Sequence, residues 1–532
     1  MLSIIRLSFV SPRPNRDFII LKLHFQDKRP YTRAMKTPKT YSAIPNGFNA
    51  ELVTIEGDIT KGLGYFNIVG MPDKTVEESR ERIRAAIRNS GMSFPTDKVT
   101  INLAPAELQK RGSYLDLPIA VNILALTGQL NASDLQDSIF VGELALDGKI
   151  RPLRGIINIA ELAAKRHFKR IYLPAQNATQ AQLVATKNLR IFPVTSLKEL
   201  WLMLKEITQP QPVKTVVKNT QTDSANVYLD QIIGQEVAKR ALVIAVAGHH
   251  NLLLSGPPGA GKSLLASVAP NLLPPLNKQE SIEATKLHSL VADLTDIIHD
   301  RPFRAPHHSA SASAIIGNGL PGEISLAHTG VLYLDEIPEF RRDLLESLRQ
   351  PLENKRITIT RAKGRQSYPA DFMLIATMNP CPCGYYGSKD HACKCTITQI
   401  HNYQHKLSGP LLDRIDMTVK VDKVANSVLV KNTTFSTREH ASAKHQIEQA
   451  LSRQFKRQHK YNANLSSYEI AQQCQLTPAA RSRLEAISKK YSLSARSYFK
   501  LIKVAQTIAD LAESTHILPK HVSEAAQFRD EI

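Results

Sequence analysis

Several features that would place this 532-residue chain at a membrane or outside the cell are missing from its sequence. No apolar run approaches the roughly 18 residues that a membrane-spanning helix needs, so we expect no membrane partner. Arg6, Pro12, Arg13, Pro14 and Arg16 interrupt any apolar core of a secretory signal. We therefore expect a cytoplasmic protein whose thiols stay reduced.

Acidic residues are scarce relative to basic ones. The chain has 48 Asp and Glu against 68 Lys and Arg, a formal net charge of +20. A surplus of this size favours a polyanionic partner, most commonly nucleic acid, although charge that serves only solubility is the alternative. Most of the surplus lies beyond residues 1–34. We expect the functional chain to begin at Met35, with residues 1–34 an unstructured upstream extension; a basic arm is the alternative.

Composition and periodicity divide the remainder into four parts. Residues 35–206 alternate short strand-like and helix-like runs, which predicts a mixed α/β domain. Residues 207–227 are polar and aperiodic, as in a linker. Residues 228–428 carry the motifs described next, and residues 429–532 are rich in predicted helix. No internal repeat is visible.

A glycine-rich octapeptide follows an apolar run and precedes a segment with helical character. Its residues are Gly256, Pro257, Pro258, Gly259, Ala260, Gly261, Lys262 and Ser263. A strand, a loop and a helix in this order offer backbone N–H groups to a polyphosphate, and glycines let the backbone close around it. We expect Lys262 to reach the β- and γ-phosphates of ATP and Ser263 to face Mg²⁺. The alternative is a purely structural glycine loop.

A second motif places two carboxylates at the end of an apolar strand, residues 330–334. We expect Asp335 to hold Mg²⁺ through its water shell and Glu336 to act as general base on the attacking water. Adjacent acids at a strand end can also be plain surface charge. The phosphate loop upstream favours the catalytic interpretation.

Two further residues fit the same chemistry. Asn379 follows another apolar run, residues 372–378, where an amide can position the water or the γ-phosphate. Arg414 can reach the γ-phosphate of a neighbouring subunit, and phosphoryl transfer gains most of its rate from such placement of charge. An ion pair of Arg414 with Asp413 or Asp416 is the alternative.

Together these motifs resemble the Walker A, Walker B, sensor and arginine-finger elements of an AAA+ ATPase. The finer resemblance is to the magnesium-chelatase-like branch and, within it, to the ComM/YifB family of bacterial competence proteins. The stretches that carry it are 234–236, 239–242, 248–251, 301–308, 321–328 and 379–384, and in the first domain 66–73, 78–82 and 102–106.

The resemblance implies an α/β protein with a Lon-protease-like, S5 domain-2-type first domain, an AAA+ P-loop domain with a parallel sheet, and a helical C-terminal lid. It also implies Asn379 as sensor 1, Arg414 as arginine finger and Arg496 as sensor 2, with Gly234 and Gln235 flanking the adenine. Three positions depart from the family pattern, which puts their roles in doubt: Asn318, Lys500 and Gln506.

The activity that the resemblance implies is a hexameric helicase ring that promotes branch migration of DNA during natural transformation. Its partners would be single-stranded or branched DNA and recombinases. Two other activities stay open, a chelatase motor that drives Mg²⁺ into a porphyrin and an ATP-dependent protease. Ser113 lies where a Ser/Lys protease site would be sought, but no partner lysine is identifiable, so we expect no proteolysis.

Four of the five cysteines fall within fifteen residues: Cys381, Cys383, Cys393 and Cys395. Two closely spaced pairs of thiolates suit tetrahedral Zn²⁺, and His391 is a candidate replacement for one ligand. Reduced cysteines without a metal are the alternative. We expect Cys474, in a helical stretch, to serve packing.

Two basic stretches lie between the catalytic motifs, residues 301–308 and residues 355–365. The second alternates like a strand and turns near Gly364. We expect it to face the channel of a ring and follow DNA phosphates. The alternative is a solvated hairpin edge, where basic residues discourage aggregation.

Overall fold

The computed structural model describes residues 37–208, 227–294, 296–361, 364–388, 391–424 and 437–529. The predicted extension (1–34) and most of the predicted linker (209–226) lie outside these residues. Among the described helices, none is long and apolar enough to cross a membrane.

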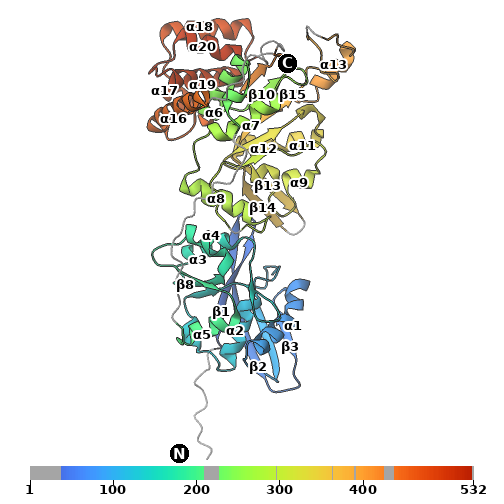
Figure 1. The fold of residues 1–532 in the computed structure, drawn as a ribbon, viewed down its shortest axis with the longest axis vertical. Coiled ribbons are helices and arrows are strands. Elements are labelled where there is room, and N and C mark those ends of the chain that lie inside the picture. Colours follow the sequence, from blue (N-terminus) through green and yellow to red (C-terminus); the bar gives the residue numbers. More distant parts are fainter. Residues whose placement is uncertain are drawn as a thin grey trace, which may run out of the picture. The chain divides into compact units, whose positions relative to one another are not determined.

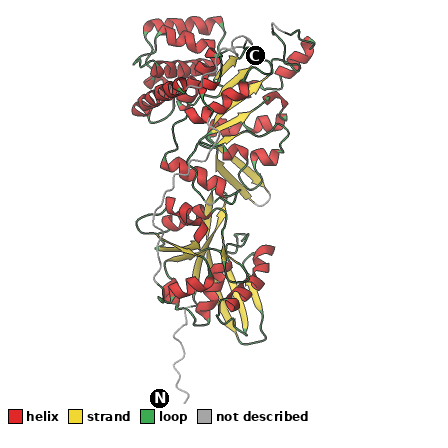
Figure 2. Ribbon diagram, in the orientation of Figure 1, coloured by secondary structure: helices red, strands yellow, loops and turns green. Residues whose placement is uncertain are grey.

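The first part of the described chain forms a mixed seven-stranded sheet with helices on both faces (Figure 1, Figure 2). Its elements are β1 (Lys39–Asn46), β2 (Asn49–Thr60), β3 (Phe66–Val69), α1 (Lys74–Asn89), β4 (Lys98–Ala104), α2 (Asp116–Leu126), β5 (Ser138–Phe140), β6 (Glu143–Leu144), β7 (Ile150–Arg151), α3 (Ile156–Lys165), β8 (Arg170–Pro174), α4 (Ala178–Leu183), β9 (Arg190–Val194) and α5 (Leu197–Leu204). The strand order of the seven-stranded sheet is β3-β4-β2-β1-β5-β8-β9, and β6 and β7 form a separate antiparallel pair.

Alternation along the strands explains the two layers of helices on this sheet. Successive strand residues point to opposite faces, so Ile139 and Ile171 join one buried cluster while Phe140 and Tyr172 join another. The first cluster is completed by α3 and α4, and the second by α1, α2 and α5. The central strands β5 and β8 are therefore buried on both faces, whereas β2 and β4 alternate between buried and more exposed residues.

The second part is built on a five-stranded parallel sheet. Its elements are α6 (Glu236–Gly248), β10 (Leu252–Ser255), α7 (Lys262–Leu272), α8 (Lys278–Ser289), β11 (Phe303–Arg304), α9 (Ala312–Ile316), α10 (Glu323–Leu326), β12 (Val331–Leu334), α11 (Arg342–Ser347), α12 (Arg349–Asn354), β13 (Arg356–Arg361), β14 (Gly364–Pro369), β15 (Met373–Met378), α13 (Ile397–Gln404), α14 (Gly409–Leu412) and β16 (Met417–Lys420). The sheet order is β11-β12-β15-β10-β16, and β13 and β14 form a separate antiparallel hairpin.

The third part is helical. Its helices are α16 (Arg438–Gln458), α17 (Ser467–Gln473), α18 (Pro478–Lys490), α19 (Ala495–Leu511) and α20 (Pro519–Gln527). Their apolar faces share one buried cluster with α6, α7 and one face of the parallel sheet. The predicted α/β class with a parallel sheet and a helical C-terminal region is confirmed.

Candidate active site

The order of the strands brings three of the predicted motifs to one edge of the parallel sheet. The phosphate loop follows β10, the two carboxylates follow β12, and Asn379 follows β15. Because β15 lies between β12 and β10, its end must lie between the other two motifs. The carboxyl ends of parallel strands are where α/β proteins bind their ligands.

The phosphate loop has the backbone that its glycines predict. Gly259 and Gly261 have φ of 76° and 86°, a region that L side chains rarely adopt, and Gly261 caps the amino end of α7. The Lys262 ammonium donates to the carbonyls of Gly256 at 2.6 Å and Pro257 at 3.0 Å. Burial lowers the pKa of Lys262. A buried cation inside a loop of backbone amides fits a polyphosphate.

Asn379 bridges the two ATPase motifs. Its Oδ1 accepts a hydrogen bond from the Lys262 ammonium at 3.1 Å, and its Nδ2 donates to the Glu336 carboxylate at 3.4 Å. The Ser263 hydroxyl donates to Asp335 at 3.4 Å. Hard oxygen donors from a hydroxyl and a carboxylate fit Mg²⁺, which prefers few protein ligands and several waters.

Thr377 is a member of this site that our sequence interpretation did not include. Its hydroxyl donates to the Asp335 carboxylate and accepts the backbone N–H of Glu336 at 3.0 Å. Glu336 has φ of 48°, a strained value for a side chain other than glycine. The sequence did contain a signal for Thr377, which is a hydroxyl residue within an otherwise apolar strand, two residues before Asn379.

Gly234 and Gln235 lie beside the phosphate loop. The Gln235 side chain donates to the carbonyl of Ala260 at 3.1 Å and to that of Asp422 at 2.5 Å. Both residues have positive φ, which turns the chain into α6. This position is compatible with the predicted role at the nucleotide base.

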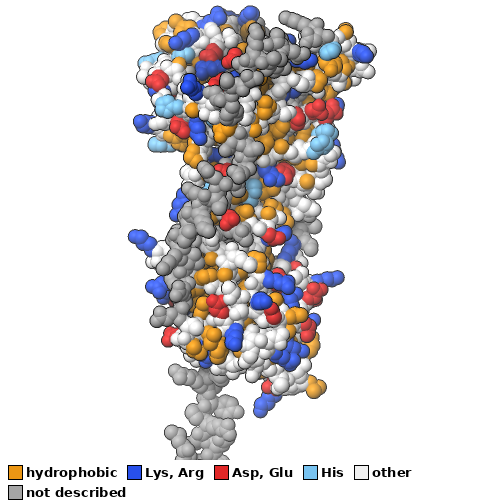
Figure 3. Space-filling view, in the orientation of Figure 1, with side chains coloured by type: hydrophobic (Ala, Val, Ile, Leu, Met, Phe, Trp, Pro, Cys, Tyr) orange, Lys and Arg blue, Asp and Glu red, His pale blue; other side chains and the backbone are white. Residues whose placement is uncertain are grey.

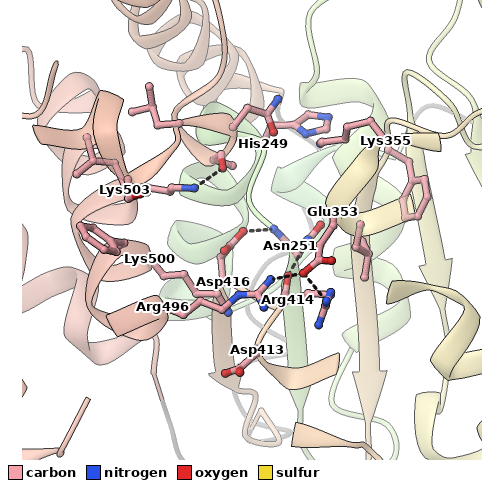
Figure 4. A pocket seen from close by; sticks show the side chains of 18 residues that line it. His249, Asn251, Glu353, Lys355, Asp413, Arg414, Asp416, Arg496, Lys500 and Lys503 are labelled. Atoms are coloured by element: carbon pink, nitrogen blue, oxygen red, sulfur yellow. Dashed lines mark hydrogen bonds and ion pairs between the residues drawn. The ribbon is translucent and has the colours of Figure 1, made fainter. Parts of the chain in front are cut away.

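Arg414 and Arg496 meet at a second place, a pocket lined by α12, α17 and α19. Both guanidinium groups donate to the same carboxylate oxygen of Glu353, Arg496 at 3.2 Å (Figure 4). Arg414 is 8% exposed, and its hydrogen bond is the first cause of the lowered pKa of Glu353. The alternative ion pair with Asp413 or Asp416 is wrong, because Glu353 is the acidic partner of Arg414.

The two arginines lie at the far end of β10 from the phosphate loop of their own chain. Asn251, just before β10, donates to the carbonyl of Arg414 at 2.8 Å, whereas the loop begins after Ser255 at the other end. Four residues of strand separate these ends by about 13 Å. Arg414 and Arg496 are thus grouped with each other and apart from Lys262.

The three positions that depart from the family pattern are all engaged inside the chain. Lys500 donates to the carbonyl of Ile415 at 2.7 Å, and burial lowers its pKa to about 8. Gln506 donates to Asp510 at 3.1 Å, and the backbone N–H of Asn318 bonds Leu320.

Three cations of the two basic stretches form ion pairs within the chain. Arg301 is ion-paired with Glu280 at 3.0 Å, and Arg304 with Glu323 at 2.5 Å. Lys355 ends α12 and pairs with Asp371 at 2.6 Å. These three cations therefore have acidic partners within the chain. The sequence alone had indicated two basic stretches without such partners.

The hairpin itself is confirmed, with its turn between Arg361 and Gly364. The side chains of Arg361, Ala362, Lys363 and Gly364 lie outside the description. Over the described residues on the face drawn in Figure 3, basic and acidic side chains are interspersed. The described Lys and Arg side chains are therefore not gathered into one patch on that face.

The first domain shows no assembled protease dyad around Ser113. The Ser113 hydroxyl donates to Glu143, while the buried ammonium of Lys110 donates to the carbonyl of Pro105. Among the described residues, these two side chains therefore bond to Glu143 and Pro105 and not to each other.

Three family models match the chain. "Magnesium chelatase, subunit ChlI" matches residues 228–429, its C-terminal model matches residues 437–529, and "Subunit ChlI of Mg-chelatase" matches residues 55–177. The competence protein ComM of Haemophilus influenzae is 42% identical over 92% of this chain and 96% of its own length. The chain belongs to the ComM/YifB family of magnesium-chelatase-like AAA+ proteins.

Other relatives define how far this likeness extends. YifB of Escherichia coli K12 is 42% identical over 91% of this chain and 95% of its own length. The magnesium-chelatase 67 kDa subunit of Chlorobaculum parvum is 26% identical over only 28% of this chain. The ComM/YifB likeness therefore covers all three parts of the fold, and the family implies ATP and Mg²⁺ for the site described above.

Proposed function

We propose that this chain is an ATP-hydrolysing ring motor that acts on DNA, a helicase that promotes branch migration during natural transformation. The observation that carries the ATPase is the convergence of Lys262, Glu336 and Asn379 at one sheet edge. Two observations support DNA as the substrate. The chain is similar to a competence protein, and it has a basic hairpin, β13 and β14.

In this proposal each residue at the sheet edge has one task. Lys262 exchanges its loop carbonyls and Asn379 for the β- and γ-phosphates of ATP. Ser263 and Asp335 would hold Mg²⁺, which supplies positive charge against the phosphates. Glu336 accepts a proton from the attacking water, and Asn379 keeps its carboxylate in place. Thr377 orients Asp335 and the backbone of Glu336 together.

The position of Arg414 and Arg496 supports a ring, which we take as hexameric. Since both lie at the end of β10 remote from their own phosphate loop, we infer that they reach the γ-phosphate of a neighbouring subunit. In the isolated chain both are paired with Glu353. Arg496 would then act beside Arg414, rather than as a sensor on its own nucleotide.

The hairpin is the element we propose to contact DNA. It packs against the loop after α9, because the Tyr368 hydroxyl donates to the carbonyl of Gly319 at 2.9 Å. Leu320 in that loop is 49% exposed. A basic hairpin and an apolar loop tip, held together, can follow phosphates and place an apolar side chain against bases in a channel.

Replacing Arg356, Arg361, Lys363 and Arg365 by Ala tests this contact. Affinity for single-stranded DNA should fall, and the slope of log K against log salt should flatten by about 0.7 per lost phosphate contact. Basal ATP hydrolysis should persist, because none of the four lies among the nucleotide-site residues. DNA stimulation of the ATPase and strand displacement should fall together. Fluorescence anisotropy over a salt series and an unwinding assay measure these effects.

A charge-matched control removes four exposed cations from the helical part: Arg481, Lys489, Lys490 and Lys520. This variant should keep the wild-type salt slope. If the hairpin variant also kept the wild-type salt slope, the hairpin would be only a charged edge.

ATPase assays with single-stranded DNA, forked DNA, casein and porphyrin in turn compare the proposed motor with the protease and chelatase alternatives. Stimulation by casein or porphyrin alone would contradict the proposal.

A further inference from the structure

The four clustered cysteines converge on one point in space. The sulfur of Cys381 lies 3.4 Å from that of Cys383 and 3.7 Å from that of Cys393, and Cys383 and Cys393 are 3.6 Å apart. All four sulfurs, including that of Cys395, lie within 4.8 Å of one another. Four thiolates bound tetrahedrally at about 2.3 Å from one Zn²⁺ are separated by about 3.8 Å. The cluster therefore has the dimensions of a zinc site with four cysteine ligands.

Disulfides or a histidine ligand fit the geometry of this cluster less well than four cysteine ligands do. A disulfide needs sulfurs about 2.05 Å apart, well below the separations observed. Two sulfurs also accept backbone N–H groups, Cys381 from Tyr386 at 3.3 Å and Cys393 from Cys395 at 3.4 Å. His391 does not belong to the group; its ring packs on Tyr385 instead.

The segment that carries the cysteines has little else to fix it. Its described residues, 381–388 and 391–395, form neither helix nor strand. Cys381 and Gly384 are its buried members, and Tyr386 is 53% exposed. Without a metal, a loop of this kind gains little from apolar burial, and metal binding then supplies its folding free energy.

This same loop touches two parts of the ATPase site. It begins two residues after Asn379, the side chain that bridges Lys262 and Glu336. At Gly384, a Cβ would lie 2.6 Å from Cδ of Pro258 in the phosphate loop. The same Cβ would lie 3.9 Å from Cγ of Asn379. The backbone of the cysteine loop at Gly384 therefore packs closely on Pro258 of the phosphate loop and lies near the side chain of Asn379.

We propose that Cys381, Cys383, Cys393 and Cys395 bind one structural Zn²⁺, and that this site holds Asn379 and Pro258 in their catalytic positions. Cys381 links the two functions, because it is both a ligand and the second residue after Asn379. The coupling, though not the metal site, rests on the proposed ATP hydrolysis. Loss of the metal is expected to slow turnover more than it weakens nucleotide binding, since Lys262 and the loop amides remain.

Metal content tests the site without reference to activity. Purified protein should contain about one zinc per chain, because four ligands complete one tetrahedral site. Cobalt(II) exchanged into it should give the visible absorption of tetrahedral thiolate coordination. The double variant Cys393→Ser, Cys395→Ser, which spares the buried Cys381, should lose the metal. His391→Ala and Cys474→Ala should keep it. Correctly folded wild-type protein without stoichiometric metal, even after incubation with Zn²⁺, would overturn the proposal.

Combining zinc removal with the Asn379→Ala substitution tests whether the zinc site acts on ATP hydrolysis through Asn379. Treating the wild type with a zinc-selective chelator, in excess Mg²⁺, should lower kcat about tenfold or more, as loss of a supporting shell does elsewhere, and added Zn²⁺ should restore it. Binding of a fluorescent ATP analogue should change much less. In Asn379→Ala, chelation should cause little further loss of kcat, because the coupled side chain is already gone.

Two outcomes separate the parts of the proposal. An equal fall of kcat on chelation of both proteins would overturn coupling through Asn379. A protein that holds one zinc but hydrolyses no ATP under any condition would support the metal site and contradict the proposed function.

Discussion

Replacing Glu336 by Gln is expected to lower kcat for ATP hydrolysis by about 100- to 10,000-fold while ATP stays bound, because only the general base is removed. Lys262→Ala should instead lose ATP affinity, since its ammonium is the buried cation of the phosphate loop. Equilibrium binding of a fluorescent ATP analogue and steady-state ATPase kinetics separate the two defects.

Glu339→Gln is the matched control for Glu336→Gln. Glu339 lies three residues further along, is exposed, and pairs with Lys406 at 3.4 Å rather than with a nucleotide-site residue. It should hydrolyse ATP at close to the wild-type rate. A Glu336→Gln protein with wild-type turnover would show that the assignment of the general base is wrong.

Replacing Arg414 by Ala should leave ATP binding nearly intact and lower kcat by about 10³-fold or more, the effect of losing an arginine finger. Arg496→Ala should show a defect of the same kind, because the two guanidinium groups share Glu353. Mixing Arg414→Ala chains with Lys262→Ala chains should restore part of the activity. Each chain then supplies, at a shared interface, the residue that the other lacks.

The control for this experiment is Arg453→Ala, which removes an arginine that pairs with Glu513 at 3.1 Å on the helical part. It should neither lower kcat nor complement Lys262→Ala. Formation of mixed rings is established first by pull-down of differently tagged chains. Mixed rings that stay inactive would contradict action between neighbouring subunits.

The local motifs were predictable because each depends on residues that adjoin in the sequence. An apolar run, glycines able to adopt positive φ and a helix start define the phosphate loop without reference to the rest of the chain. Residues 330–336 predict a buried strand with carboxylates at its end in the same way. The helix-rich character predicted for residues 429–532 also follows from local periodicity, and the described helices α16 to α20 agree with it.

The partners of side chains were not predictable, because they come from elements far apart in the chain. Nothing near Arg414 in the sequence indicates Glu353, which is 61 residues away, or the approach of Arg496. The sequence placed Lys355 in a basic stretch predicted to follow DNA, whereas in the structure Lys355 forms an ion pair with Asp371. An excess of positive residues is a property of composition, whereas their availability depends on which carboxylates packing brings near.

The family, the α/β class and the residues of the phosphate loop and Walker B motif follow from the sequence alone, because they depend on short patterns and on 42% identity to a known relative. The bridge that Asn379 makes between Lys262 and Glu336 is visible only in the folded chain, because it depends on β15 lying between β10 and β12. The packing of the cysteine loop on Pro258 is likewise visible only in the fold. Strand order and loop packing arise from contacts between distant segments, which no local pattern specifies.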